Sequence, residues 1–426
     1  MKKVYLLSAV ACLLVAFIFL FSCNKNEHTP KPAEKNLRLV SEDSAKAIAV
    51  TFNPANFYNT SNPNNHSPFR SPLNGHNAIS TVDIIRDSAG QPAIYVVSFA
   101  DNAGFVYVSA DYNMQPLLGF VERGHFGDGK LPYGMQLWVD QKLNHIRMVR
   151  EGFYDNKSAA AAWEAYSGQN QPHANPPTKT PDTKLPPPTG CNNLPPSTSN
   201  TVGPVLPTTW GQSCSYNELC PQIGCPDCTP SALTGCIATA ISQVTRYWTT
   251  ANANNYNYGG MPLTQGNGEV ERLMHDAGLA VNMAYGCAAT GGSGSQAQYI
   301  APALLNNFGF TSAVLEGYNI VHVFNNLGGG WPVILCAFDA LHAGQNGHCW
   351  VVDGIQNGTI YYCIDNNLQS ESYAYFHMNW GEHEIFGNND FNGWFSTDNW
   401  TVTGWYGPGT AADWQSGISQ VYNIHP

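Results

Sequence analysis

After an initial apolar run, the first half of the chain consists of short apolar blocks separated by turn-forming residues. Four of these blocks predict β-strands, at 79–85, 93–98, 104–109 and 116–121. Apolar residues at helical spacing predict a helix over 135–153, and Ser41 is a typical N-cap for another helix that runs to Val50. Together these elements predict a small α+β domain over residues 37–165.

The second half of the chain shows helical spacing first and strand patterns afterwards. Helices are predicted at 236–248, 270–277 and 297–308, and strands at 332–337, 349–352, 361–364 and 373–378. This order favours a second α+β domain, over residues 208–426. Residues 166–207, which lie between the domains, are rich in Pro, Thr, Asn and Ser and predict an exposed linker that is open to proteolysis.

The helix predicted at 236–248 begins at a cysteine. Its apolar face is formed by Ile237, Ile241, Val244 and Trp248, which places Cys236 in the first turn. There the partial positive charge of the helix and its unpaired N–H groups favour a thiolate. Cys236 is therefore either a nucleophile or a small buried residue at the start of a core helix.

Charge is scarce and unevenly distributed along this globular sequence. Only 12% of the residues are charged while 43% are hydrophobic, which excludes a disordered chain. Residues 185–426 contain two basic and fifteen acidic residues, which gives a net charge of −13, whereas residues 1–184 carry a net charge of +2. We therefore expect no nucleic-acid partner for the acidic half. Its shortage of Lys and Arg also leaves few sites for trypsin-like proteases.

The first residues have the pattern of an export signal. Lys2 and Lys3 precede the apolar run Val4–Phe21, and residues 20–23 resemble the lipobox of bacterial lipoproteins. By this resemblance residues 1–22 are a signal peptide, Cys23 becomes a lipidated N-terminus, and residues 23–36 form a tether. An ordinary signal peptide or a membrane anchor is the alternative. We expect a protein that is lipid-anchored in the bacterial cell envelope, at the outer membrane, and released from the cell after processing.

A cysteine nucleophile needs a base and donors for an oxyanion, and the second domain offers candidates for both. His348 stands at the start of an apolar run, where a histidine can face a cleft while the strand stays buried. A purely structural histidine is the competing interpretation, and His377 fits that role better. Gln212 carries a side-chain amide that can donate to an oxyanion.

Ordered motifs of the second domain resemble the streptopain family of papain-fold cysteine peptidases. They are Gly211-Gln212 with Tyr216-Asn217, Gly235–Ala240, Gly347–Gly354 and His377–Gly381. The resemblance covers about residues 208–426 and implies that Gln415–Pro426 forms the closing strand. The first domain, above all Gly104–Tyr112, resembles the inhibitory propeptide of that family.

The resemblance implies a secreted zymogen in which a small α+β propeptide domain inhibits a papain-like peptidase domain. Cys236 would be the nucleophile and His348 the general base. Gln212 and the Cys236 N–H would form the oxyanion hole, while Asn379 and Trp380 would orient and shield the imidazole. Peptide bonds would be cleaved through a thioester, with no metal and no cofactor.

Three partners are expected: protein or peptide substrates, the chain's own propeptide, and the membrane through the lipid on Cys23. The charges of the two domains are complementary, which helps the propeptide to dock. Cleavage in the 166–207 linker would both activate the enzyme and free it from its anchor.

The chain departs from the family pattern in the segment after His377. The family continues Asn-Trp-Gly-Trp-Gly-Gly, whereas this chain has Glu382 in place of the second Trp and an insertion after it. The segment between Trp248 and Glu271 is also short. Both departures border the expected active site, so they bear on substrate preference and on how the imidazole is oriented.

Four clustered cysteines, Cys214, Cys220, Cys225 and Cys228, form a second constellation. Their spacing permits a zinc site, but outside the cell disulfides are favoured, and a redox Cys-x-x-Cys lacks its usual strand–helix context. We expect disulfides that tie the loop carrying Gln212 to the segment before Cys236. Cys349 is expected to be a buried strand residue.

Two other classes of function compete with the peptidase. A papain-fold surface protein with impaired catalysis could bind peptide or glycan through aromatics such as Trp394, Trp400 and Trp405, and the Glu382 loop is its sequence support. An inhibitor-type protein dominated by residues 37–165 would leave the motifs of the second domain unexplained.

Overall fold

The structure is a computed structural model. It describes residues 39–51, 78–127, 131–153, 159, 162–163, 198–250, 254–338, 347–364, 367–382, 391–397 and 418–426. The predicted signal peptide, Cys23 and the tether lie outside these residues, as do Trp400 and Trp405.

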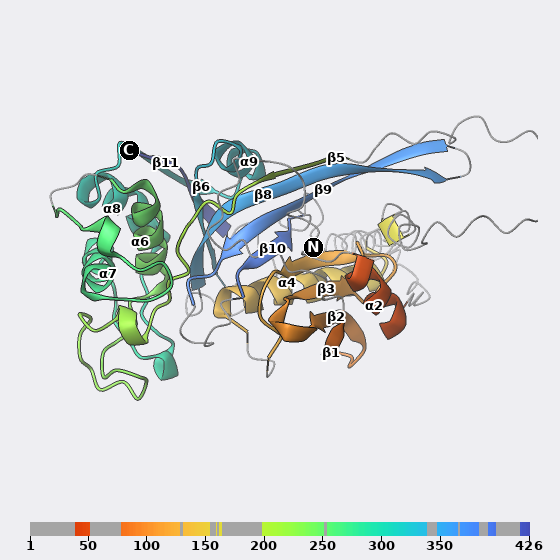
Figure 1. Ribbon diagram of the computed structural model, residues 1–426, viewed down its shortest axis with the longest axis horizontal. Coiled ribbons are helices and arrows are strands. Elements are labelled where there is room, and N and C mark those ends of the chain that lie inside the picture. The colour runs from red at the N-terminus through yellow and green to blue at the C-terminus, as the bar shows by residue number, and fades with distance from the viewer. Residues whose placement is uncertain are drawn as a thin grey trace, which may run out of the picture.

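The first domain is an antiparallel sheet with a helix on each face (Figure 1). Its strands pair in chain order: β1 (Ile79–Arg86), β2 (Pro92–Phe99), β3 (Phe105–Ser109) and β4 (Leu117–Val121). Helix α2 (Glu42–Thr51) begins after Ser41, whose Oγ accepts the Ser44 N–H at 3.1 Å. Helix α4 (Tyr133–Arg150) covers the opposite face. Alternate residues of β2 and β3 belong to two different cores, as the side-chain period of a strand requires.

The second domain combines a group of helices with a sheet (Figure 1). The helices α6 (Cys236–Trp248), α7 (Gly268–Ala280) and α8 (Ile300–Asn307) pack against one another. The strands are β6 (Ser312–Gly317), β7 (Val333–Phe338), β8 (Gly347–Ile364), β9 (Asn367–Asn379), β10 (Gly393–Ser396) and β11 (Ile418–His425), and α9 (Ile320–Gly328) lies between β6 and β7. The prediction of two α+β domains is therefore confirmed, although β6, α9 and β10 were not predicted.

The two domains share one continuous sheet. Its strand order is β1-β2-β3-β4-β10-β9-β8-β7-β11-β6. The junction is the antiparallel pair β4–β10, in which Phe120 lies opposite Trp394 and Gly119 opposite Phe395. The first domain thus extends the sheet of the second by main-chain hydrogen bonds as well as by side-chain packing.

The end of the predicted linker belongs to the second domain. Residues Thr198–Val202 form β5, which pairs with the long hairpin of β8 and β9 that projects from the molecule (Figure 1). Just beyond β5, Leu206 is buried, and its N–H donates to the Asp353 carboxylate at 3.0 Å. The prediction of a linker is therefore wrong at its end, because residues 198–202 form a strand and Leu206 is buried. The polar and proline-rich composition of residues 198–207 does not predict a strand, and β5 is a strand because its backbone pairs with β8.

Helix α4 packs against strands of both domains. One core joins Trp138 of α4 to Tyr107 of β3 and Phe395 of β10, with ring centroids 5.4 and 4.9 Å apart respectively. The same core includes Trp350 and Trp380 of the second domain. Because α4 completes this apolar core, the first domain shares its core with the second domain.

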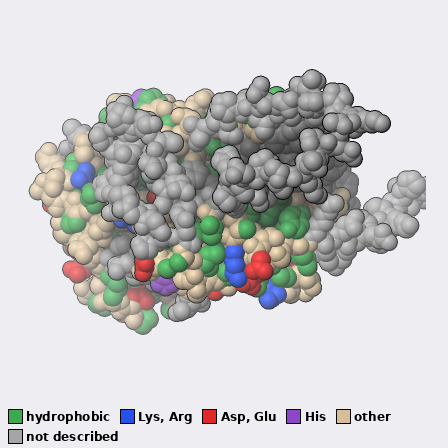
Figure 2. Space-filling model, turned by 45° about the vertical axis from the view of Figure 1, so that its right-hand side comes forward, with side chains coloured by type: hydrophobic (Ala, Val, Ile, Leu, Met, Phe, Trp, Pro, Cys, Tyr) green, Lys and Arg blue, Asp and Glu red, His purple; other side chains and the backbone are tan. Residues whose placement is uncertain are grey.

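Figure 2 shows one face on which Lys, Arg, Asp and Glu side chains are few among hydrophobic and uncharged polar ones. Among the described residues no helix has the length and apolar character needed to cross a membrane. The same part of the chain contains no group of three or more His, Cys, Asp or Glu side chains placed to bind a metal ion.

Candidate active site

Cys236 is the first residue of α6, and the residue before it must be a glycine. Gly235 has φ 87°, in the region that favours glycine, and a Cβ built on it would lie 2.6 Å from the Met283 side chain. The Gly235 carbonyl accepts the Thr239 N–H at 3.0 Å, which starts the helical hydrogen bonds. This close approach fixes where the Cys236 side chain leaves the backbone.

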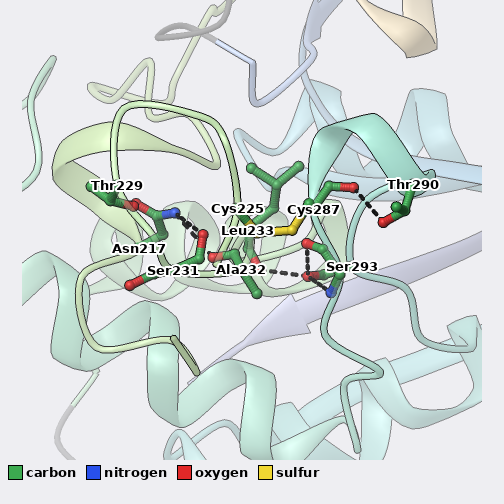
Figure 3. Close-up of a disulfide and its surroundings, with 10 residues drawn as sticks. Asn217, Cys225, Thr229, Ser231, Ala232, Leu233, Cys287, Thr290 and Ser293 are labelled. Carbon is green, nitrogen blue, oxygen red and sulfur yellow. Dashed lines mark hydrogen bonds between the residues drawn. A yellow bond between two sulfur atoms is a disulfide. The ribbon is translucent and has the colours of Figure 1, made fainter. Parts of the chain in front are cut away.

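The segment that leads to Cys236 is held from both sides (Figure 3). Asn217 donates its side-chain amide to the carbonyls of Ser231 and Ala232, at 3.2 and 3.0 Å. On the other side, Ser293 donates its hydroxyl to the Leu233 carbonyl at 2.6 Å, and the Cys225–Cys287 disulfide lies beside it. The loop before the cysteine is therefore positioned by side chains from two other loops.

The disulfides differ in part from the predicted set. Cys214 pairs with Cys228, and Cys225 pairs with Cys287. Cys220 is a free buried thiol, so the expectation that it joins a disulfide is wrong; burial raises its pKa to about 12. The partner Cys287 lies 62 residues from Cys225 in the sequence, and the local clustering of cysteines gave no sign of it.

A further disulfide lies next to the site. Cys349 is buried in β8 as predicted, but it is also bonded to Cys336, its antiparallel neighbour on β7. The backbone N–H of Cys349 donates to Sγ of Cys236 at 3.4 Å. This contact brings the start of α6 against the start of β8 and therefore close to His348.

Gln212 lies on the other side of the loop before Cys236. Its backbone carbonyl accepts the Thr234 N–H at 3.0 Å, and its side chain is 6% exposed. Among the hydrogen bonds of the described residues, none involves its side-chain amide. The amide is thus available as a donor, and its role in an oxyanion hole stays a prediction.

His348 is buried at the start of β8, and its ring is hydrogen-bonded to the segment that follows β9. Its Nε2 donates to the backbone carbonyl of Trp380 at 2.9 Å, and its ring stacks near that of Trp350. Within the described part of the chain no hydrogen bond joins His348 to Cys236. The structure therefore brings Cys236 and His348 to one site, but the two side chains are not hydrogen-bonded to each other.

Of the two residues predicted to orient and shield the imidazole, Trp380 contacts His348 and Asn379 is hydrogen-bonded elsewhere. Trp380 contacts His348 through its main-chain carbonyl, while its indole N–H donates to the Phe391 carbonyl at 3.0 Å. The Asn379 amide is engaged elsewhere: it exchanges hydrogen bonds with Gln243, at 3.1 and 3.2 Å, and donates to the Thr208 carbonyl at 2.7 Å. In this state Asn379 positions the strand end, and its role in orienting the imidazole stays a prediction.

Gln243 is a residue of the site that was not predicted from the sequence. It is fully buried on α6, and its Oε1 also accepts the Trp210 N–H at 3.1 Å and the Thr208 hydroxyl at 3.0 Å. It thus ties together α6, the segment after β5 and the end of β9. Gln243 lies seven residues after Cys236, two turns along the same side of the helix, and a polar residue at this position was the available signal.

Glu382 and the start of α4 complete the site. One oxygen of Glu382 accepts the Tyr133 N–H at 3.0 Å, and the other lies 3.4 Å from His348 Nε2. A Cβ built on Gly134 would lie 2.6 Å from both His348 and Trp380, so the helix backbone touches the two rings. The first domain therefore sits directly on the predicted catalytic histidine.

Burial dominates the pKa values of the site. Burial raises the pKa of Cys236 to about 11, although the N–H of Cys349 acts in the opposite direction and the nearby Glu382 adds to the rise. Burial also lowers the pKa of His348 to about 4 and raises that of Glu382 to about 7. Desolvation thus outweighs the helix N–H groups and disfavours the thiolate that was expected at the helix start.

Comparisons with known proteins agree with this geometry. Residues 210–259 and 249–391 match the model of the Peptidase C10 family, and residues 37–146 match that of the Spi protease inhibitor. These matches support a cysteine peptidase that is made as a zymogen with its own inhibitor domain. The match of the second domain to the peptidase C10, or streptopain, family agrees with the resemblance that the sequence motifs carry.

Two solved structures from Prevotella intermedia resemble the chain. One is a prointerpain A fragment in mutant form, with 22% identity and a TM-score of 0.52, which covers 82% of this chain and 99% of its own. The other is active wild-type interpain A cysteine protease, with 25% identity and a TM-score of 0.38, which covers 53% of this chain and 96% of its own. The first shows that the zymogen fold is shared. No curated protein matches the sequence.

Trp394 bears on the alternative that the chain is a binding protein. It is 2% exposed, and its ring stacks on that of Phe120 in the first domain with centroids 6.3 Å apart. Its indole N–H donates to Glu122 at 2.6 Å. In this state Trp394 holds the inhibitor domain and is not available to a peptide or glycan.

Proposed function

We propose that the chain is an exported cysteine endopeptidase made as an autoinhibited zymogen, with Cys236 as nucleophile and His348 as general base. One observation supports it above all. The start of β8 brings His348 and the Cys349 N–H to the first turn of α6, and the start of α4 covers that spot. A cysteine, a histidine and an inhibitor domain thus meet at one place.

The proposed reaction is acyl transfer in two stages. The Cys236 thiolate attacks a peptide carbonyl, and the oxyanion that forms accepts hydrogen bonds from the Cys236 N–H and the Gln212 amide. The C–N bond then breaks, and the His348 imidazolium gives its proton to the leaving amine. Water attacks the resulting thioester while His348 takes a proton from it, and the acid product leaves Cys236 as before.

The precursor, in which α4 covers the site, is poorly suited to this reaction. A thiol with a pKa of about 11 and an imidazole with a pKa of about 4 are both neutral near pH 7, so no thiolate–imidazolium pair forms. Removal of α4 would let water reach both groups and let the imidazole turn toward Cys236. Both pKa values would then move toward those of a reactive pair.

Export and anchoring also belong to the proposal. The apolar run Val4–Phe21 and the lipobox-like residues before Cys23 support a lipid anchor in the cell envelope. The disulfides support an oxidising compartment, where such bonds persist. Cleavage between the domains, upstream of β5, would release the peptidase from that anchor.

The test is the fate of the full chain under mild reduction. We expect the wild-type precursor to lose its first domain, as followed by intact mass, and then to cleave casein. Cys236→Ala should stay whole and inactive. The matched control is Cys220→Ala, which removes the other free thiol of the described residues and should convert like the wild type.

If the wild type stays whole, an added protease can cut the linker. A cut form that then cleaves no casein and labels with no thiol-directed peptide probe at Cys236 would rule the peptidase out. The chain would then be a peptide-binding protein that keeps the fold.

A further inference from the structure

Helix α4 begins without a cap of its own. Its N-cap position is Pro132, which makes no side-chain hydrogen bond, and its first turn holds no acidic residue. The first N–H groups of a helix have no partner within the helix, and a nearby carboxylate stabilises them. Because the start of α4 is buried against the second domain, its partners have to come from there.

Glu382 fills this position from the other domain. Its Oε2 accepts the N–H of Tyr133, the first residue of α4, at 3.0 Å. Glu382 is 5% exposed, so the contact lies in the interface and not at its rim. The geometry is that of an N-terminal helix cap, except that the capping side chain lies 249 residues further along the chain.

The same carboxyl group also faces the catalytic histidine. Its Oε1 lies 3.4 Å from His348 Nε2, and the Tyr133 ring lies edge-on to the His348 ring with centroids 6.1 Å apart. Glu382 also lies near enough to Cys236 to raise the pKa of that thiol. One side chain therefore touches the inhibitor helix and the histidine at once.

We propose that Glu382 caps helix α4 across the domain interface and is a positioning residue through which the inhibitor domain holds His348. The inference rests on the proposed function and deepens it, because it names the side chain through which the inhibitor domain contacts the active site. It also gives a role to the position at which the sequence departs from the Asn-Trp-Gly-Trp pattern of the family. A Trp there has no carboxylate to accept the Tyr133 N–H.

Both charge states of Glu382 can make this contact. Burial raises the pKa of Glu382 to about 7, while the Tyr133 N–H acts in the opposite direction. A protonated carboxyl still has an oxygen that accepts an N–H, and so does an amide. Glutamine should therefore replace Glu382 as a cap, whereas alanine cannot, and aspartate is one methylene shorter.

The experiment measures amide hydrogen exchange in the full-length precursor that carries Cys236→Ala, so that no processing occurs. We expect Glu382→Ala to raise the exchange rate of the Tyr133 amide about tenfold, the loss typical of a helix cap. Glu382→Asp should do the same if the alanine variant does not fold. Glu382→Gln should leave the rate within about twofold of that of the parent.

The control is Glu271→Gln, which changes another buried carboxyl whose pKa is also raised by burial, on α7 in the helical part of the peptidase domain. It should leave Tyr133 exchange unchanged. An unchanged Tyr133 rate in Glu382→Ala or Glu382→Asp would overturn the proposal. So would an equal rise at the amides of β2, because that would mean global unfolding and not loss of a cap.

The two proposals can fail separately. Exchange is read in an inactive chain, so a protein without peptidase activity can still show the cap. Labelling of Cys236 by a thiol probe in the uncut precursor adds the link to the active site. In uncut precursors that keep Cys236, we expect Glu382→Ala to label several-fold faster than the wild type and Glu382→Gln to label like the wild type; equal rates in all three would overturn the link between Glu382 and the site.

Discussion

Three titratable side chains define the resting site at the scale of single residues: His348 and Glu382 are buried, and Cys236 is partly exposed. Burial favours the neutral form of each, with a pKa of about 11 for Cys236, about 4 for His348 and about 7 for Glu382. Near neutral pH the thiol and the imidazole are uncharged and the carboxyl is half protonated. The inhibitor domain thus acts on the chemistry by removing water as well as by blocking substrate.

This burial predicts how precursor stability depends on pH. The pKa of Glu382 rises from 4.5 to about 7 on folding, so its contribution to stability is complete below pH 4.5 and is lost as the pH rises through 7. The pKa of His348 falls from 6.5 to about 4, so its contribution is complete above pH 6.5 and is lost as the pH falls through 4. From about pH 6.5 to 8, Glu382 should dominate.

In a Cys236→Ala background we therefore expect the free energy of unfolding to fall by about 1 kcal/mol between pH 6.5 and 8. The measurement is a urea titration at each pH. Glu382→Gln, which cannot ionise, should flatten this slope. An equal slope in both chains would show that other groups control the stability in this range.

The contact of Gly134 with the active site predicts the effect of one methyl group. A Cβ at this position would lie 2.6 Å from the buried rings of His348 and Trp380. Gly134→Ala should therefore destabilise the precursor by roughly 1–3 kcal/mol and speed its conversion. The control is Gly268→Ala at the start of α7, where nothing lies within 4 Å, and it should change the thermal midpoint little.

The sequence indicated the residues that meet at the proposed active site better than it indicated their partners. Cys236 and His348 could be predicted because a helix start and a strand start leave recognisable patterns. The partners of Asn379 and Glu382 could not, because they lie more than 100 residues away in the sequence, on Gln243 and Tyr133. Which hydrogen bonds form also depends on whether the inhibitor domain is docked, and no sequence pattern encodes that state.

At the scale of elements, the loop before Cys236 depends on two disulfides of different span. Cys214–Cys228 closes a loop of 14 residues and Cys225–Cys287 one of 62. The chain-entropy model assigns about 3 kcal/mol to the shorter and about 4 kcal/mol to the longer. The longer one also joins the nucleophile loop to the loop that carries Ser293.

We therefore expect Cys225→Ser with Cys287→Ser to lower the thermal midpoint more than Cys214→Ser with Cys228→Ser. It should also slow conversion more, because it frees the segment before Cys236. Thermal unfolding and intact-mass time courses measure the two effects. Equal losses for both pairs would show that the span of the loop is not what matters here.

Elements with strong periodicity were predicted and those set by their surroundings were not. The helix 236–248 has an uninterrupted apolar face, and its predicted bounds match α6. By contrast, β10 has only four residues, and it is a strand because β4 and β9 flank it. Strand β5 likewise has a linker-like sequence, and backbone pairing with β8 makes it a strand.

At the scale of the whole molecule, the shared sheet and the shared core join the two domains into one unit. The junction combines the β4–β10 pair, the Phe120–Trp394 stack and the Tyr375 hydroxyl, which donates to the Leu117 carbonyl at 3.2 Å. We expect the Cys236→Ala precursor to unfold in one calorimetric transition, with equal calorimetric and van't Hoff enthalpies. Two resolved transitions would show that the domains melt independently.

The place of β10 in this sheet has a consequence for the released enzyme. In the zymogen β10 is an interior strand with all four residues buried. When the first domain departs, β10 becomes a sheet edge, and the apolar side chains that faced α4 meet water. Bare edges and apolar patches promote self-association. Loss of the first domain would thus make the peptidase domain more prone to aggregate than the precursor, so the protein concentration at which cleavage occurs would decide how long the enzyme survives.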